Sequence, residues 1–337
     1  MKRAVVYPGR IAVEDAPTPE PRAGEALVRT LVTGVCGSDV HAAHGRHPFV
    51  GLPYRPGHEA VGVVAATGPE ASGVRPGQRV VVIPYLPCRT CKMCTTGRPN
   101  LCENLAFFGC GYPQGGMAEF FTLPADRLHP VPDAMTDEAA ALIEPLSTPV
   151  HAVGLAGEVA GRTVAILGAG TIGLFTLAVL RDRQARKIVV TDPLPDKRAR
   201  ASALGADAVI DAGTPDVAGQ VRDALGESAD IVFDCVAIQS SMAQAVAIAD
   251  KGGTVVTVGV PARDVSVPLP LIQDHQIRIQ GSATYLPADY EESVRLLSEG
   301  VVRAADFVTA TRALPQVAEA FELAAAGTQV KVLVTVG

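Results

Sequence analysis

The chain has 337 residues, of which 48 % are hydrophobic and 19 % are charged, and its formal net charge is −6. This composition supports a large buried core and about two domains, and it excludes a disordered chain. There is no block of basic residues, Trp is absent and aromatic residues make up 4 % of the chain, so a nucleic-acid partner is not expected.

The N-terminal residues do not match an export signal. Lys2 and Arg3 precede an apolar run that ends at Tyr7, whereas a secretory signal needs about 7–15 apolar residues. No run approaches the roughly 18 apolar residues that span a membrane. We therefore expect a cytoplasmic protein without a membrane partner. In such a protein, clustered cysteines indicate metal binding or catalysis rather than disulfide bonds.

The N-terminal part of the chain, up to about residue 145, is rich in Gly and Pro and contains short apolar stretches separated by turns. This pattern is typical of short antiparallel strands in a barrel-like sheet. The apolar stretches are residues 26–35, 60–66 and 78–83, and the turn signals are residues 51–53, 55–57 and 75–77.

The middle of the chain alternates apolar strands with helical segments, which predicts an α/β fold with a doubly wound parallel sheet. The first strand is a continuous apolar run, as in strands that are buried on both faces. The predicted strands are residues 163–167, 187–191, 208–210, 231–234, 254–258 and 277–281. The predicted helices are residues 173–183, 196–204, a segment opened by Thr214 and Pro215, and residues 240–250. After Tyr285, helices near 289–298 and 314–325 precede a strand at 331–336.

A glycine-rich turn links the first strand of this sheet to the following helix. Gly168, Gly170 and Gly173 lie in a G-x-G-x-x-G frame, which alone is a weak signal in a chain with 33 glycines. The flanking strand and helix strengthen it, because the three glycines then permit the tight turn, the approach of a pyrophosphate and close helix packing. The helix N-terminus, which includes Ile172, offers free N–H groups to the phosphates of a dinucleotide.

An acidic residue closes the second strand. Asp192 lies 19 positions after Gly173, where a carboxylate accepts hydrogen bonds from the ribose 2′-OH and repels a 2′-phosphate. This favours NAD over NADP as the cofactor, although Lys197 and Arg198 downstream would soften that repulsion. The alternative is an ordinary strand–helix turn followed by an exposed Asp.

Four cysteines lie within fifteen residues, in the spacing C-x2-C-x2-C-x7-C. Four thiolates so placed can surround one tetrahedral Zn²⁺ and leave no open position, which fits a structural site. An iron–sulfur cluster uses the same donors, and free or disulfide-bonded thiols are a further alternative. The residues are Cys88, Cys91, Cys94 and Cys102.

A second set of metal-ligand residue types is scattered along the chain. Each member is ordinary by itself, because a lone Cys is usually a small buried hydrophobe and a lone His is more often structural than a ligand. The four residues are Cys36, His58, Glu59 and Glu144.

The joint order of these motifs resembles the zinc-containing medium-chain dehydrogenases over nearly the whole chain, most closely the sorbitol and threonine dehydrogenase branch. The resemblance implies a GroES-like, mostly β catalytic domain (residues 1–146 and 286–337), a Rossmann domain (residues 147–285) and a homodimer or homotetramer. Cys36 and His58 match residues that hold a catalytic zinc, with Glu59 or Glu144 as the third ligand. Classical alcohol dehydrogenases carry Cys in the slot of Glu144, so the Glu points to the polyol branch.

Three protein ligands leave a fourth position for water or substrate, so the resemblance implies two zinc ions per chain, one catalytic and one structural. The catalytic ion would act as a Lewis acid on the oxygen of a small polar alcohol or ketone. Ser38 matches a residue that bonds the substrate oxygen, and His41 matches a relay base that passes the proton to solvent. Residues that match positions near the nicotinamide are Thr148, Val258, Gly259 and Val260.

The predicted activity is hydride transfer between NAD(H) and the carbinol carbon of a small polar alcohol. One rival is a zinc-independent NADPH-linked quinone or enoyl reductase, which would lack both sets of metal-ligand residues. Another rival is a non-catalytic NAD-binding protein, which would not need Ser38 and His41. Three cationic residues that follow Cys36 are candidates for attracting an anionic substrate group, against the alternative of a solvated loop; they are His44, Arg46 and His47.

Overall fold

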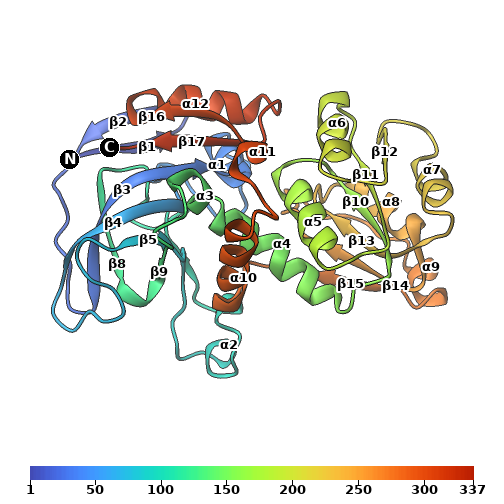
Figure 1. Ribbon diagram of the computed structural model, residues 1–337, viewed down its shortest axis with the longest axis horizontal. Helices are drawn as coiled ribbons and strands as arrows, with labels where there is room; N and C mark the ends of the chain where they lie inside the picture. Colours follow the sequence, from blue (N-terminus) through green and yellow to red (C-terminus); the bar gives the residue numbers. More distant parts are fainter. The chain divides into compact units, whose positions relative to one another are not determined.

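The computed structural model describes residues 1–337, and the chain divides into two compact units. The first unit comprises Met1–Pro145 and Leu286–Gly337, and the second comprises Leu146–Tyr285 (Figure 1). No helix is both long and apolar enough to cross a membrane.

A seven-stranded sheet forms the centre of the first unit, with the order β16-β17-β3-β4-β5-β9, and β8 pairs with β3 away from this path. All its pairings are antiparallel except β16 with β17, which is parallel. The barrel-like sheet of short antiparallel strands predicted from the sequence is therefore present. The strands are β3 (Glu25–Val35), β4 (Glu59–Thr67), β5 (Arg79–Val82), β8 (Phe120–Pro124), β9 (Leu128–Pro130), β16 (Val308–Ala313) and β17 (Lys331–Thr335).

Two short hairpins and several helices complete the first unit. The last helix, α12 (Val317–Ala325), buries Val317, Ala320 and Phe321 in one apolar cluster with Val332 and Val334 of β17. The hairpins are β1 (Lys2–Tyr7) with β2 (Arg10–Asp15) and β6 (Tyr85–Leu86) with β7 (Ala106–Phe107). The helices are α1 (Gly37–Ala43), α2 (Lys92–Thr95), η1 (Pro99–Leu101), η2 (Ala125–Arg127), α3 (Asp137–Ala140), α10 (Pro287–Ser298), α11 (Ala304–Phe307) and η3 (Leu314–Gln316).

The second unit is a six-stranded parallel sheet with the order β12-β11-β10-β13-β14-β15, and helix α4 (Ile143–Ala156) leads the chain into it. Counted from its first strand, this order is 3-2-1-4-5-6, the doubly wound arrangement in which ligands bind where the strand order reverses. The strands are β10 (Thr163–Leu167), β11 (Lys187–Thr191), β12 (Ala208–Ile210), β13 (Ala229–Asp234), β14 (Ala249–Thr257) and β15 (Arg278–Gly281). The helices are α5 (Thr171–Asp182), α6 (Pro195–Ala203), α7 (Val217–Leu225), α8 (Gln239–Ile248) and α9 (Leu269–Asp274).

The helix boundaries in this unit differ from the sequence prediction by one or two residues, and the reason is visible at α7 and α8. Helix α7 does not begin at Pro215; the side chain of Asp216 accepts a hydrogen bond from the Gly219 N–H and caps a helix that begins at Val217. The predicted helix 240–250 ends at Ile248, because Ala249 already pairs with Ala229 as the first residue of β14.

Candidate functional site

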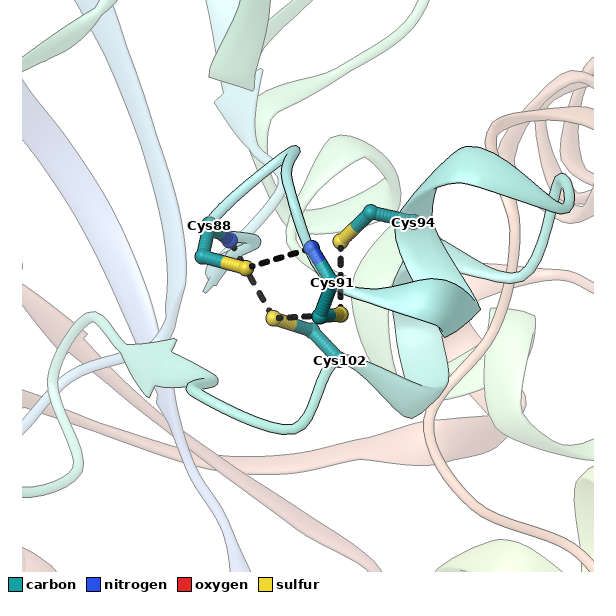
Figure 2. Close-up of side chains that lie close together, drawn as sticks. All are labelled: Cys88, Cys91, Cys94 and Cys102. Atoms are coloured by element: carbon teal, nitrogen blue, oxygen red, sulfur yellow. Dashed lines mark hydrogen bonds between the residues drawn. The ribbon is translucent and has the colours of Figure 1, made fainter.

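The four clustered cysteines converge on one point in a lobe of the first unit (Figure 2). Cys91 precedes α2, Cys94 lies within it, and Cys102 follows η1, so two short helical turns fold the chain back on itself. The ligand atoms of all four lie within 4.8 Å of one another. The Sγ atom of Cys91 lies 3.5 Å from that of Cys94 and 3.9 Å from that of Cys102.

These distances fit a single tetrahedral ion. Zinc–sulfur bonds of about 2.3 Å in tetrahedral geometry separate the sulfur atoms by about 3.8 Å. Backbone N–H groups also point at the sulfurs: that of Cys91 lies 3.4 Å from the Cys88 Sγ, and that of Cys88 lies 3.1 Å from the Cys102 Sγ. Hydrogen bonds from the Thr90 side chain and from backbone groups lower the pKa of Cys88 to about 5, whereas burial and the hydrogen bond with Cys91 raise the pKa of Cys94 to about 12.

A second cluster forms at the ends of two neighbouring strands. Cys36 follows β3 and caps α1, while His58 immediately precedes β4. Because β3 and β4 are antiparallel with Gly34 opposite Glu59, the end of one strand meets the start of the other. The ligand atoms of Cys36, His58 and Glu59 accordingly lie within 4.8 Å of one another.

The buried side chains of Asp39 and Tyr54 support the positions of Cys36 and His58. Asp39, the third residue of α1, accepts a hydrogen bond from the Cys36 N–H (3.0 Å) and from the Tyr54 hydroxyl (3.2 Å). Its other contact is with His58, whose Nδ1 is buried without a hydrogen-bond partner, 3.9 Å from the Asp39 carboxylate. Burial alone would lower the pKa of His58, but the Asp39 carboxylate and the Cys36 thiol raise it well above its usual value. A donor set of one thiol, one imidazole and carboxylates in a buried position fits a zinc ion.

Glu59 is tied to a lysine from the far end of the sequence. The Nζ of Lys331, the first residue of β17, lies 2.6 Å from Oε1 and 2.7 Å from Oε2 of Glu59. Both side chains are buried, at 3 % and 0 % exposure. The ammonium therefore engages both oxygens of this candidate metal ligand.

Glu144, the second residue of α4, is 5 % exposed. It lies near enough to His58 to contribute to the raised pKa of that imidazole. The structure thus brings Glu144 to the same neighbourhood as Cys36, His58 and Glu59, although the tight three-residue cluster does not include it.

Ser38 and His41 lie three positions apart on α1, so they share one face of that helix. Ser38 is half-buried and His41 is exposed. Partial burial, followed by the charges of Arg46 and His44, lowers the pKa of His41. A neutral imidazole at neutral pH is the form that accepts a proton.

The glycine-rich turn of the second unit has the geometry that its sequence predicts. Gly168 adopts a φ of 98°, and Gly170 precedes the first turn of α5 with open space where a side chain would be. A Cβ on Gly173 would lie 1.8 Å from the carbonyl oxygen of Gly168, so only glycine fits there. Ile172 lies half-buried in the first turn of α5. The open space at Gly170 and the N-terminus of α5 fit a bound pyrophosphate.

Asp192 follows β11 and turns its carboxylate toward the glycine loop. Its two oxygens accept hydrogen bonds from the N–H groups of Ala169 and Leu194, each 2.9 Å away. Arg198 does not neutralise this carboxylate, because its guanidinium donates to the backbone carbonyls of Asp192 (2.7 Å) and Pro193 (2.8 Å) and pairs with Asp211 (3.3 Å).

The remaining predicted residues of this unit lie on α4 and after β14. Thr148 is half-buried in α4. The N–H groups of Val258 and Gly259 donate to the carbonyl of Asp234, at 2.9 and 3.0 Å, and Val260 is exposed beyond them. Asp234 was not predicted: this fully buried carboxylate ends β13 and accepts from the N–H groups of Val236 and Ala237 and from the Ser241 hydroxyl. The feature of the sequence that could have identified this residue is an Asp at the end of an apolar strand.

Comparison with known proteins shows similarity to zinc-binding dehydrogenases over nearly the full chain. Residues 22–133 match the alcohol dehydrogenase GroES-like domain, and residues 171–299 match the zinc-binding dehydrogenase domain. Sorbitol dehydrogenase of Ovis aries is 32 % identical over 332 residues, which cover 97 % of this chain and 94 % of that protein. The chain belongs to the zinc-containing medium-chain alcohol and polyol dehydrogenases. The predicted α/β fold class, a Rossmann sheet with a GroES-like unit, is thereby confirmed.

Two solved structures of this dehydrogenase family show the range of its chemistry. A zinc-binding dehydrogenase from Sinorhizobium meliloti 1021, bound to NADP, has a TM-score of 0.92 and 32 % identity, with 99 % of this chain and 98 % of that chain covered. Galactitol-1-phosphate dehydrogenase from Escherichia coli has a TM-score of 0.90 and 26 % identity, with 99 % and 100 % covered. As a member of this family, the protein is an alcohol dehydrogenase that uses zinc and a nicotinamide dinucleotide.

Proposed function

We propose that this protein is an NAD-linked polyol dehydrogenase with one catalytic and one structural zinc per chain. The observation that carries the proposal is the meeting of Cys36, His58 and Glu59 at the ends of β3 and β4. The four clustered thiols support a second, structural zinc site. The glycine turn with Asp192 supports a dinucleotide site. In this proposal, residues 1–146 and 286–337 carry the zinc chemistry, and residues 147–285 bind the dinucleotide.

When bound, the zinc would supply a Lewis acid for the alcohol oxygen, and NAD would supply the hydride acceptor for oxidation of the carbinol to a carbonyl. Cys36 and His58 would hold the metal, and Glu59 or Glu144 would complete the set of protein ligands. The Asp39 carboxylate, 3.9 Å from the Nδ1 atom of His58, interacts electrostatically with the imidazole on the side of this ring nitrogen. Ser38 would relay the hydroxyl proton, accepting it from the substrate while its own proton moves to His41, which then releases a proton to solvent.

The preference for NAD over NADP rests on Asp192. Its carboxylate lies at the glycine loop, and the nearby Arg198 is already bonded to two carbonyls and to Asp211. A 2′-phosphate would meet an anion without an available guanidinium beside it, whereas a ribose 2′-OH can donate to that carboxylate. Thr148 and residues 258–260 are proposed to contact the nicotinamide.

The proposed substrate is a small polyol or the corresponding ketose. Two relatives act, by their names, on sorbitol and on galactitol 1-phosphate, which are both six-carbon polyols. The Glu in the slot of residue 144 agrees with this branch. A cytoplasmic location and a homodimeric or homotetrameric assembly stay predictions.

Zinc content and NAD reduction test the proposal together. The wild type is expected to contain two zinc ions per chain and to reduce NAD with a polyol. Cys36→Ser should lose one zinc and the activity, and Cys94→Ser should lose the other zinc. One zinc in both the wild type and Cys36→Ser would refute the catalytic site and favour a zinc-independent reductase.

A further inference from the structure

A cationic segment follows the candidate catalytic ligand Cys36. Between Asp39 and Glu59 the sequence contains no Asp or Glu. The same stretch contains two arginines and four histidines, which are His41, His44, Arg46, His47, Arg55 and His58. Cationic side chains elsewhere in the chain commonly face a carboxylate, as Arg79 faces Asp137 and Arg181 faces Asp207.

Local hydrogen bonds fix the end of α1 and the turn after it, which carry His44, Arg46 and His47. The His44 Nδ1 lies 2.7 Å from the Val40 carbonyl, so the ring carries its proton there and turns Nε2 outward. The Arg46 N–H donates to the His41 carbonyl at 2.8 Å, which folds the chain back beside the helix. The His47 Nδ1 accepts from the Phe49 N–H at 3.2 Å, so its Nε2 carries the ring proton and is a donor.

This group is close to the metal cluster and is not neutralised within the protein. His41 lies within electrostatic reach of Arg46 and His44, and His47 lies within reach of His41 and His58. Arg46 is exposed and forms no ion pair. His44 lies eight positions after Cys36, about 12 Å along the axis of α1, which is comparable with the length of an extended hexitol phosphate.

We propose that His44, Arg46 and His47 form an anion-recognition site for a phosphate or carboxylate group at the far end of the polyol substrate. This inference rests on the proposed polyol dehydrogenase function and narrows its substrate to polyol phosphates or sugar acids. Arg46 supplies the fixed charge and a planar set of donors that matches both oxyanions. His47 adds the Nε2–H donor, and the missing carboxylates leave the site without a competing internal anion.

Steady-state kinetics with three matched substrates test this site, using sorbitol, sorbitol 6-phosphate and gluconate. A charge-assisted contact predicts that kcat/KM for the preferred anionic substrate exceeds that for sorbitol by about 10- to 100-fold. Arg46→Gln should remove most of this preference, measured as the ratio of kcat/KM for the anionic substrate to kcat/KM for sorbitol, and the loss should appear in KM for the anionic substrate. Arg75→Gln is the matched control, because Arg75 is also an exposed arginine of the first unit but lies outside the cationic segment.

The two anionic substrates distinguish the sources of the charge. A preference for sorbitol 6-phosphate assigns the site to phosphate, and a preference for gluconate assigns it to carboxylate. Equal kcat/KM for sorbitol and both anionic substrates, unchanged in Arg46→Gln, overturns the anion site and leaves the polyol dehydrogenase function standing.

If no substrate is oxidised, the dehydrogenase proposal fails, and calorimetric binding of sorbitol 6-phosphate and gluconate tests the site by itself. Binding weakened by Arg46→Gln but not by Arg75→Gln supports the anion site. Binding that is absent, or equal in the two variants, overturns it.

Discussion

Replacing Lys331 with Met would leave the Glu59 carboxylate buried beside the candidate catalytic metal without its counter-ion. The ammonium of Lys331 contacts both oxygens of Glu59, at 2.6 and 2.7 Å, and a further contact of 3.4 Å joins it to the Val35 carbonyl. Both side chains are almost fully buried, so water cannot replace the lost partner. Removing one member of such a pair costs about 3–5 kcal/mol, because the remaining charge stays desolvated.

The expected loss of stability can be measured as a decrease in melting temperature. In a unit of roughly 200 residues, each kcal/mol lowers the melting temperature by about 2–4 °C, so Lys331→Met should melt about 6–20 °C below the wild type. Thermal unfolding followed by circular dichroism, on protein freed of metal by chelation, measures the pair without the stabilisation that zinc binding adds.

A double variant separates the ion pair from simple packing. Lys331→Met combined with Glu59→Gln removes both charges, so it should be less destabilised than Lys331→Met alone. Lys331→Arg keeps the positive charge and should fall between the wild type and Lys331→Met. A melting temperature for Lys331→Met within about 2 °C of the wild type would show that Glu59 carries no uncompensated charge, and the reasoning would fail.

Two further variants test the dinucleotide site. Gly173→Ala should abolish NAD binding in a titration followed by fluorescence, because the new methyl group would lie 1.8 Å from the Gly168 carbonyl oxygen; Gly154→Ala, where a Cβ meets nothing within 4 Å, should bind NAD normally. Asp192→Ser should raise the ratio of kcat/KM for NADP to that for NAD by about tenfold or more, since the variant no longer repels a 2′-phosphate. An unchanged ratio would mean that Asp192 does not face the ribose.

The sequence predicted the centre of the doubly wound sheet well because the strands there are apolar runs. All residues of β10 are buried, so the pattern of Thr163–Leu167 reflects its true surroundings. The end of α8 could not be predicted in the same way. An alanine-rich segment favours a helix locally, but pairing of Ala249 with Ala229 in the parallel sheet determines where the strand begins.

Strand β16 gave no usable signal, because its burial alternates between exposed and half-buried positions on the edge of the sheet. The supports of the metal cluster were also missed. Asp39 lies three residues after Cys36 at the start of a helix, a spacing that indicates a cap but not a partner for His58. Lys331 opens an apolar strand and would be taken for an exposed residue, since its contact with Glu59 spans 272 positions.

That long separation has a consequence for how the nascent protein matures. The second unit is continuous in sequence and lies between the two segments of the first, so the ribosome completes it before β17 exists. At about 5–20 residues per second, roughly 15–50 s pass between the synthesis of Glu59 and that of Lys331, 272 positions later. During this interval residues 32–35 of β3 lack the strand that covers them, and an open strand edge invites association with other chains. Slower translation would lengthen this exposure. The yield of folded protein should therefore depend on chaperones that cover the sheet of the first unit until β17 is synthesised.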